Sequence, residues 1–120
     1  MQKGYRTVNL EDGLPTADQA VRRLTFELSC AKSEHLTAIK LIHGFGSSGT
    51  GGRIRVKVRE YLGALKRRGQ IAFFITGEDF SIFSDDTRTA LYACPALRDD
   101  RDLDRHNNGI TIVILKKKGL

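Results

Sequence analysis

The sequence contains only two cysteines and no long apolar segment, and these two absences exclude several classes of protein. Cys30 and Cys94 have no cysteine nearby in the sequence, so they predict neither a disulfide scaffold nor a zinc site. We expect both to be buried thiols in a reducing compartment. No stretch approaches the roughly 20 apolar residues of a membrane-spanning helix. Since residues 1–6 also lack the apolar segment of a secretory signal, we expect a cytoplasmic protein.

Internal repeats, low-complexity tracts and linkers are also missing, so the length of 120 residues predicts a single domain over residues 1–120. The formal net charge of +6 favours polyanionic partners such as nucleic acids. This charge is unevenly distributed along the chain. Residues 53–68 contain seven basic side chains and one acid, whereas residues 85–105 contain six aspartates and four arginines. We therefore expect a basic side and a mixed, acid-leaning side.

Hydrophobic periodicity predicts alternating strands and helices along most of the chain. Thr16 and Gln19 form a capping-box signature, which predicts a first helix from this point to about Lys32. The apolar stripe of a second helix begins at Ile54, and this helix ends at Gly69. Two helices that link three strands predict a two-layer α/β sandwich, in which a four-stranded mixed sheet carries both helices on one face. The expected strands, in the order βαβαββ, are residues 5–10, 38–43, 71–75 and 110–115.

An insertion at residues 77–108 precedes the last strand and has the least regular pattern of the chain. Ser84 or Asp85 is expected to cap a short helix that ends before Pro95. Apolar side chains stand in this polar setting at Phe80, Ile82 and Phe83.

Phe26 is expected on the wrong side of the first helix, pointing away from its apolar face together with Cys30. Two interpretations follow. The insertion could fold over the first helix and cover Phe26. Alternatively, Phe26 and Cys30 could join Phe80 and Phe83 in an apolar patch that binds a partner or a second copy of the chain.

His43 ends the second predicted strand, and a glycine-rich loop that contains Gly44, Gly46 and Gly49 follows it. The loop matches G-x-G-x-x-G, but the acid that a dinucleotide site needs about 20 residues later is absent. A Walker A loop is excluded because no Gly-Lys-Ser/Thr follows. Backbone N–H groups at a helix N-terminus nevertheless suit an anion, to which Arg53 and Arg55 could add charge-assisted hydrogen bonds. The loop is therefore either a phosphate site or a long solvated turn.

His43 itself has three interpretations. It could be a structural histidine that is hydrogen-bonded to the loop. It could transfer a proton, because an ordinary histidine pKa of about 6.5 suits acid–base work at neutral pH. A metal ligand is the least favoured role, because no second histidine or acid stands at helical or strand spacing. His106 precedes the last strand and could approach the same edge of the sheet as His43.

These features resemble the Smr (small MutS-related) domain family. That family carries an L-D-x-H-G segment at its first strand and an H-G-x-G segment at the end of its second. Residues 43–46 match the second motif in full, and Ile54-Arg55 is similar to the Leu-Arg that opens the family's second helix. The first motif differs: Asn9 replaces its aspartate, and Glu11 or Asp12 falls at its histidine.

The resemblance implies nucleic-acid binding and nicking endonuclease activity on DNA or RNA. On this hypothesis His43 is the general acid or base, with Glu11 or Asp12 as the second catalytic group. Arg59 and Lys66 would track the strand along the second helix. A backbone phosphate would be held by Gly44, Gly46, Gly49, Arg53 and Arg55.

Two hypotheses from other functional classes remain open. One is a non-catalytic interaction or dimerisation module that has lost nuclease activity, with contact through the Phe26/Phe80 patch. The other is an enzyme that acts on a small phosphate-bearing molecule, which would use the same glycine-rich loop.

Overall fold

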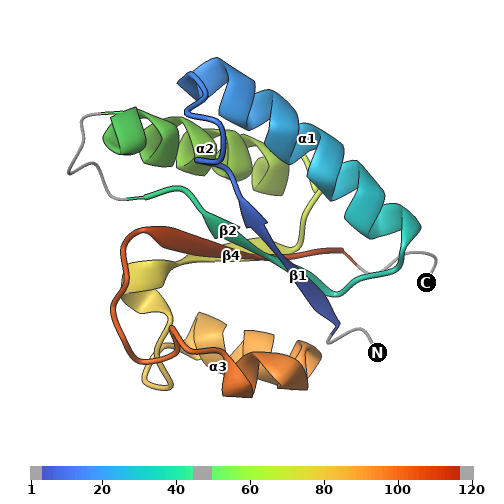
Figure 1. Ribbon diagram of the computed structural model, residues 1–120. Helices are drawn as coiled ribbons and strands as arrows, with labels where there is room; N and C mark the ends of the chain where they lie inside the picture. The colour runs from blue at the N-terminus through green and yellow to red at the C-terminus, as the bar shows by residue number, and fades with distance from the viewer. Residues whose placement is uncertain (1–3, 45–49, 117–120) are drawn as a thin grey trace.

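Four strands and three α-helices make up the fold in the computed structural model, which describes residues 4–44 and 50–116 (Figure 1). The strands and the two long helices confirm the elements expected from the sequence, with ends that differ by a few residues. None of the described helices is long and apolar enough to cross a membrane. In chain order the elements are β1 (Tyr5–Asn9), α1 (Ala17–Ser33), β2 (Ala38–Ile42), α2 (Thr50–Arg67), β3 (Phe73–Thr76), η1 (Gly77–Asp79), α3 (Asp85–Ala93), η2 (Pro95–Asp99) and β4 (Ile110–Ile114).

The sheet is mixed, as expected, with the strand order β1-β2-β4-β3. β1 and β2 are parallel, and β4 is antiparallel to both of its neighbours. β1, β2 and β3 therefore all end at one edge of the sheet, where β4 and α2 begin (Figure 1). We call this edge, with residues 9–12, 42–44, 76–78 and 107–111, the carboxyl edge. The carboxyl ends of strands are where α/β folds place their ligands.

α1 and α2 pack side by side on one face of the sheet, as the sequence predicted (Figure 1). The insertion covers the opposite face, so that helical segments lie on both sides of the sheet. β2 and β4 are buried on both faces for this reason, which explains their nearly continuous apolar sequences. The core on the α1–α2 side includes Leu24, Ile39, Leu41, Leu62 and Val113, and the core under the insertion includes Ile75, Phe80, Leu97 and Ile112.

Side-chain caps set the helix starts that the sequence predicted. The Thr16 side chain accepts from the Gln19 main chain, and the Gln19 side chain accepts from the Thr16 main chain, which completes the capping box. Ser84 is the cap of α3, because its hydroxyl accepts from the Thr87 N–H at 3.3 Å. Asp85, the other candidate, is the first residue of that helix.

Both predictions about Phe26 are wrong. The insertion packs on the face of the sheet opposite to α1, and Phe26 is 65% exposed on that helix. Phe80 is fully buried beneath the insertion, so it cannot share a surface patch with Phe26. The amphipathic pattern of α1 placed Phe26 correctly away from the core, but nothing in the pattern identified which side of the sheet the insertion covers.

A buried ion cluster holds the insertion against the sheet. Lys40 projects from β2 towards the insertion, and its Nζ atom lies 2.8 Å from Asp100 and 2.6 Å from Asp102. Asp100 also accepts a hydrogen bond from the Tyr5 hydroxyl at 2.8 Å. Burial and this bond raise the pKa of Tyr5 above its ordinary value. The cluster ties β1, β2 and the end of η2 together.

Candidate functional site

The carboxyl edge brings the two motif regions together. Asn9 pairs with Ile42 in the sheet, and the Leu10 N–H donates to the Ile42 carbonyl at 2.8 Å. Just beyond this pair, the Glu11 carboxylate rests against Gly44, so closely that a Cβ atom on Gly44 would overlap it. Gly44 has a φ of +76°, a conformation that glycine adopts without strain. The backbone of Gly44 therefore lies directly against the Glu11 side chain and leaves no room for a larger residue.

The structure separates the two acids that the sequence left as alternatives. The Glu11 N–H donates to the Asn9 side chain at 2.9 Å, and this local turn aims Glu11 towards Gly44. Asp12 is exposed and points to α1, where its carboxylate lies 3.9 Å from the Arg23 guanidinium. Glu11 is therefore the acid that lies at the second motif.

His43 is completely buried on the α1–α2 side of the sheet, and both of its ring nitrogens are hydrogen-bonded. Its Nδ1 atom lies 2.8 Å from the Gly44 carbonyl, which can only accept, so Nδ1 carries the proton. Its Nε2 atom then accepts from the Thr111 hydroxyl at 2.8 Å, and that hydroxyl accepts from the Nε–H of Arg59 at 3.2 Å. We call Arg59, Thr111, His43 and Gly44 the His43 chain. It fixes a single tautomer of the imidazole.

The environment of His43 keeps its ring neutral. Burial lowers its pKa to about 4, and the positive charges of Arg59 and Arg55 act in the same direction. The hydrogen bond to the Gly44 carbonyl opposes this effect without reversing it. At neutral pH the imidazole is therefore uncharged, and the group that it contacts is the first residue of the loop. This arrangement corresponds to the structural interpretation of His43.

Arg59 directs its guanidinium into the carboxyl edge. It forms a two-pronged pair with Glu78 at 2.8 and 3.1 Å, and it donates to the Ile110 carbonyl at 3.1 Å. Partial burial opposes ionisation of Glu78, but the Arg59 guanidinium outweighs it and lowers the pKa of that carboxyl. Arg59 thus uses most of its donors within the fold, and its contact with a nucleic-acid strand stays a prediction.

The other predicted basic residues lie along the outside of α2. Arg53 is exposed in the first turns, and Lys66 is exposed about 10 Å further along the axis than Arg59. Arg55 is half-buried and lines a surface hollow of about 520 Å³ with Arg59 and Glu78. Gly46 and Gly49 lie outside the described residues.

His106 reaches the carboxyl edge without joining His43. Its Nδ1 atom lies 3.2 Å from the Glu78 carbonyl, to which it donates, whereas the nitrogens of His43 contact Gly44 and Thr111. The histidine pair considered from the sequence is therefore not formed. Among the described residues, no group of three His, Cys, Asp or Glu side chains is placed to hold a metal ion.

On the insertion side of the sheet, Glu11 borders a polar cleft of about 610 Å³ that also contains Lys40, Asp102 and Asn107. Partial burial opposes ionisation of Asp102, but hydrogen bonds from Lys40 and Asn107 lower the pKa of this carboxyl. The cleft and the His43 chain thus lie on opposite faces of the sheet, and they meet at Gly44.

Sequence reasoning missed Thr111 and Lys40, although a signal for both was present. Each is a polar residue within a short, otherwise apolar strand. A buried polar side chain requires a partner, so such residues point to an internal network. Glu78 gave no comparable signal, because an acid after a strand is common on a surface.

Comparison with known proteins supports the resemblance at the level of the fold. The crystal structure of the Smr domain of Thermus thermophilus MutS2 matches this chain with a TM-score of 0.56 and 23% sequence identity. The match covers 93% of this chain and 99% of that one. No protein-family model and no curated protein matches the sequence. The chain therefore has the fold of an Smr domain, as residues 43–46 and the order of elements predicted.

Proposed function

We propose that this domain binds the sugar–phosphate backbone of a nucleic acid along the first half of α2, beside the glycine-rich loop. The hollow lined by Arg55 carries this proposal. Arg55 has no ion-pair partner among the described residues, whereas the neighbouring Arg59 is paired with Glu78. A half-buried, unpaired guanidinium at the edge of a hollow suits a phosphate oxygen.

The charge at the start of α2 supports the same proposal. The first turn of α2 contains no acid, although the first turns of α1 and α3 contain Asp18 and Asp85. The positive end of the helix dipole is thus left without a negative side chain from its own first turn. Arg53 adds a further exposed positive charge. We assign the backbone phosphate to this end of α2.

Within this proposal, His43 is a positioning residue. It is neutral, buried and bonded to Gly44, so its role is to fix where the loop begins. Arg59 has the same kind of role, because it holds Thr111 and Glu78 in place. The free cysteines, Cys30 and Cys94, are consistent with a cytoplasmic location, which we propose on this ground.

Binding of fluorescently labelled duplex DNA and single-stranded RNA would test the proposal, measured by anisotropy between about 50 and 200 mM salt. The affinity should fall with salt, with a slope near −0.9 per phosphate contacted on duplex DNA. Arg55→Ala should weaken binding and reduce this slope by about one. Arg98→Ala is the matched control, since it removes an equal charge from the insertion.

Glu78→Gln gives a second, opposite arm of the same experiment. It removes a negative charge beside Arg55 but keeps an oxygen that can accept from Arg59, so binding should tighten about threefold. A salt-independent affinity, or equal losses in Arg55→Ala and Arg98→Ala, would show that α2 is not the binding surface.

Nicking is a second candidate function, which the contact between Glu11 and Gly44 favours. This contact places a carboxylate at the start of the loop, where it can accept a proton from an attacking water or hydroxyl group. Supercoiled plasmid and structured RNA should be nicked by the wild type and not by Glu11→Gln, with and without chelator. His43→Ala should lower activity by displacing the loop. Equal activity in the wild type and both variants would mean that another site or a contaminant cleaves the substrate.

A further inference from the structure

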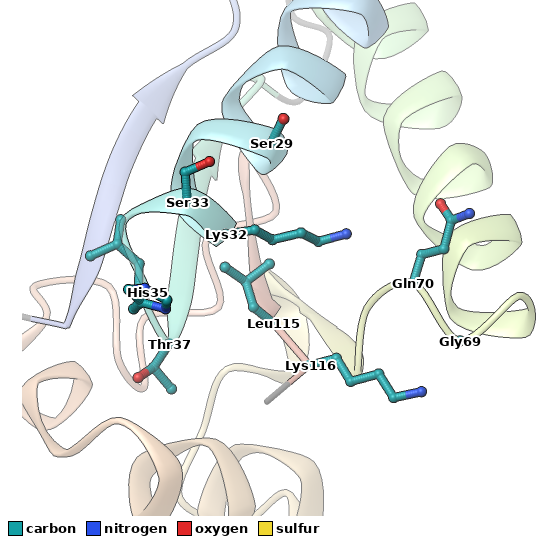
Figure 2. A pocket seen from close by; sticks show the side chains of 10 residues that line it. Ser29, Lys32, Ser33, His35, Thr37, Gly69, Gln70, Leu115 and Lys116 are labelled. Atoms are coloured by element: carbon teal, nitrogen blue, oxygen red, sulfur yellow. The ribbon is translucent and has the colours of Figure 1, made fainter. Parts of the chain in front are cut away.

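A hollow of about 600 Å³ lies at the opposite edge of the sheet from the carboxyl edge (Figure 2). Its walls come from the last turns of α1, the connection to β2, the residues that follow α2, and the end of β4. Small-molecule sites in proteins have volumes of about 300–1,000 Å³. We call this hollow the lysine pocket, after Lys32 and Lys116.

The polar side chains around the lysine pocket are not used by the described part of the fold. No hydrogen bond or ion pair joins any of them to another described residue. These side chains are exposed, apart from the half-buried Thr37, so their polar atoms are open to a ligand in the hollow that they border. Besides His35, they include Ser29, Lys32, Ser33, Thr37, Gln70 and Lys116.

The charge of the lysine pocket is positive. Lys32 extends from α1, and Lys116 extends towards Gly69 on the far wall (Figure 2). No aspartate or glutamate lines it, and the nearby Glu34 is paired with Arg6. The two lysines also face the negative ends of the α1 and α2 dipoles, which their full charges outweigh. The lysine pocket should therefore favour a ligand that carries an anionic group.

The floor of the lysine pocket is apolar and fixed. Leu36 and Leu115 belong to the core and are only 7% and 5% exposed. Main-chain bonds hold both of them, from the Leu36 N–H to the Ala31 carbonyl at 3.0 Å and from the Leu115 N–H to the Thr37 carbonyl at 2.9 Å. A ligand that has an apolar or aromatic part beside its anionic group would match the small apolar surface of this floor.

We propose that the lysine pocket binds a nucleotide monophosphate unit. Its phosphate pairs with Lys32 and Lys116, and its base lies against Leu36 and Leu115. The hydroxyl groups and Gln70 supply hydrogen bonds to the sugar and to the edge of the base. The unit is either a free nucleotide or the 5′-phosphorylated end of a strand, since both carry the same groups. This site is independent of the proposed backbone contact, because α2 separates it from the carboxyl edge (Figure 1).

Titration of the ¹⁵N-labelled protein with four probes, followed by amide NMR, would test this proposal. The probes are adenosine 5′-monophosphate, inorganic phosphate, adenosine, and a 5′-phosphorylated dinucleotide. The monophosphate should give saturable shifts at the amides of Ser33, Thr37 and Gln70. Phosphate and adenosine alone should bind at least about tenfold more weakly, since each makes only part of the contacts. Saturation by the dinucleotide alone would identify a strand end as the source of the ligand.

Variants complete the test. Lys32→Ala and Lys116→Ala should each weaken binding by about fivefold, because each removes one charge-assisted contact at an exposed position. Lys57→Ala removes an exposed lysine from the middle of α2 and should leave the affinity unchanged. The proposal is overturned if none of the probes saturates by about 10 mM, if the shifts occur only at the start of α2, or if all three variants weaken binding equally.

Discussion

The Nε2 atom of His43 lies 2.8 Å from the Oγ1 atom of Thr111, although 68 positions separate the two residues in the chain. This bond connects the end of β2 to the start of β4, and Arg59 extends it to α2. In the sequence, a histidine followed by glycines looks like a local motif. In the structure, a distant strand holds this histidine in place. The positions of His43 and Gly44 thus depend on residues that the motif does not contain.

Thr111→Val should destabilise the protein by about 1–3 kcal/mol, because it leaves the buried His43 and Arg59 nitrogens without their shared partner. Valine keeps the shape of threonine, so packing is preserved. Chemical denaturation of the wild type and the variant measures this difference. Thr7→Val, at an exposed position of β1, is the control and should change stability by less than about 0.5 kcal/mol. If both substitutions lowered stability equally, the hydrogen bonds of the His43 chain would not contribute to stability in this way.

The stability of the protein should fall between about pH 6.5 and pH 4. In the unfolded chain His43 has its ordinary pKa of 6.5, and in the fold burial lowers this pKa to about 4. The unfolded state therefore binds a proton first as the pH decreases, and the folded state loses up to about 3 kcal/mol relative to it.

His43→Gln should remove this component of the pH dependence, because glutamine does not titrate. Unfolding free energies of both proteins at pH 4, 5, 6 and 7 would measure it. Glu78 and Asp102 have lowered pKa values in the fold, so their contributions disappear at still lower pH. Parallel pH curves for the wild type and His43→Gln would contradict a neutral, buried His43.

Gly44→Ala should destabilise the protein for two separable reasons. Its φ of +76° costs an L-residue about 1–2 kcal/mol, and the new Cβ atom would overlap the Glu11 carboxylate. Gly13→Ala isolates the first reason, since Gly13 has a φ of +81° and open space around it. Thermal and chemical denaturation should therefore rank Gly44→Ala as the more damaging change. Adding Glu11→Ala to Gly44→Ala should recover the difference, and no recovery would mean that Glu11 does not rest on Gly44.

Lys40→Met should cost about 3–5 kcal/mol at neutral pH, because it leaves Asp100 and Asp102 buried without their shared cation. The triple variant with Asp100→Asn and Asp102→Asn should regain much of this loss, since no uncompensated charge then remains. Denaturation midpoints at pH 7 would give both values. If the triple variant is no more stable than Lys40→Met, packing of the lysine stem rather than charge holds the insertion.

Much of the fold could be predicted from the sequence because the relevant signals are local. Thr16 and Gln19 specify the start of α1 through a bond between near neighbours, and Ser84 does the same for α3. The apolar runs of β2 and β4 record burial on both faces. The side of the sheet that the insertion covers was not predictable, because it depends on Lys40 pairing with Asp100 and on Phe80 joining the apolar core beneath the insertion.

From the sequence we expected the two motif regions at the ends of β1 and β2, but the contacts that their side chains make could not be predicted. The structure places His43 and Gly44 directly after β2 and the two acids, Glu11 and Asp12, just after β1, where the sequence predicted the strands to end. Whether His43 faces the solvent or the core depends on its phase in the strand and on what packs there. From the sequence, Arg59 is one of several basic residues on the same helix. Only the structure distinguishes it from Arg55, through its contacts with Thr111 and Glu78.

The order of strands in the sheet has a consequence for synthesis on the ribosome. β4 is the last described strand in the chain, yet it lies between β2 and β3 and pairs with both. Until residues 110–114 have emerged, β2 has an unpaired edge and β3 has no strand to pair with, so the sheet between the two cores is incomplete. The nascent chain can form the β1–α1–β2 unit early, but it cannot complete the domain. The edges of β2 and β3 that pair with β4 are therefore covered only when this final strand inserts.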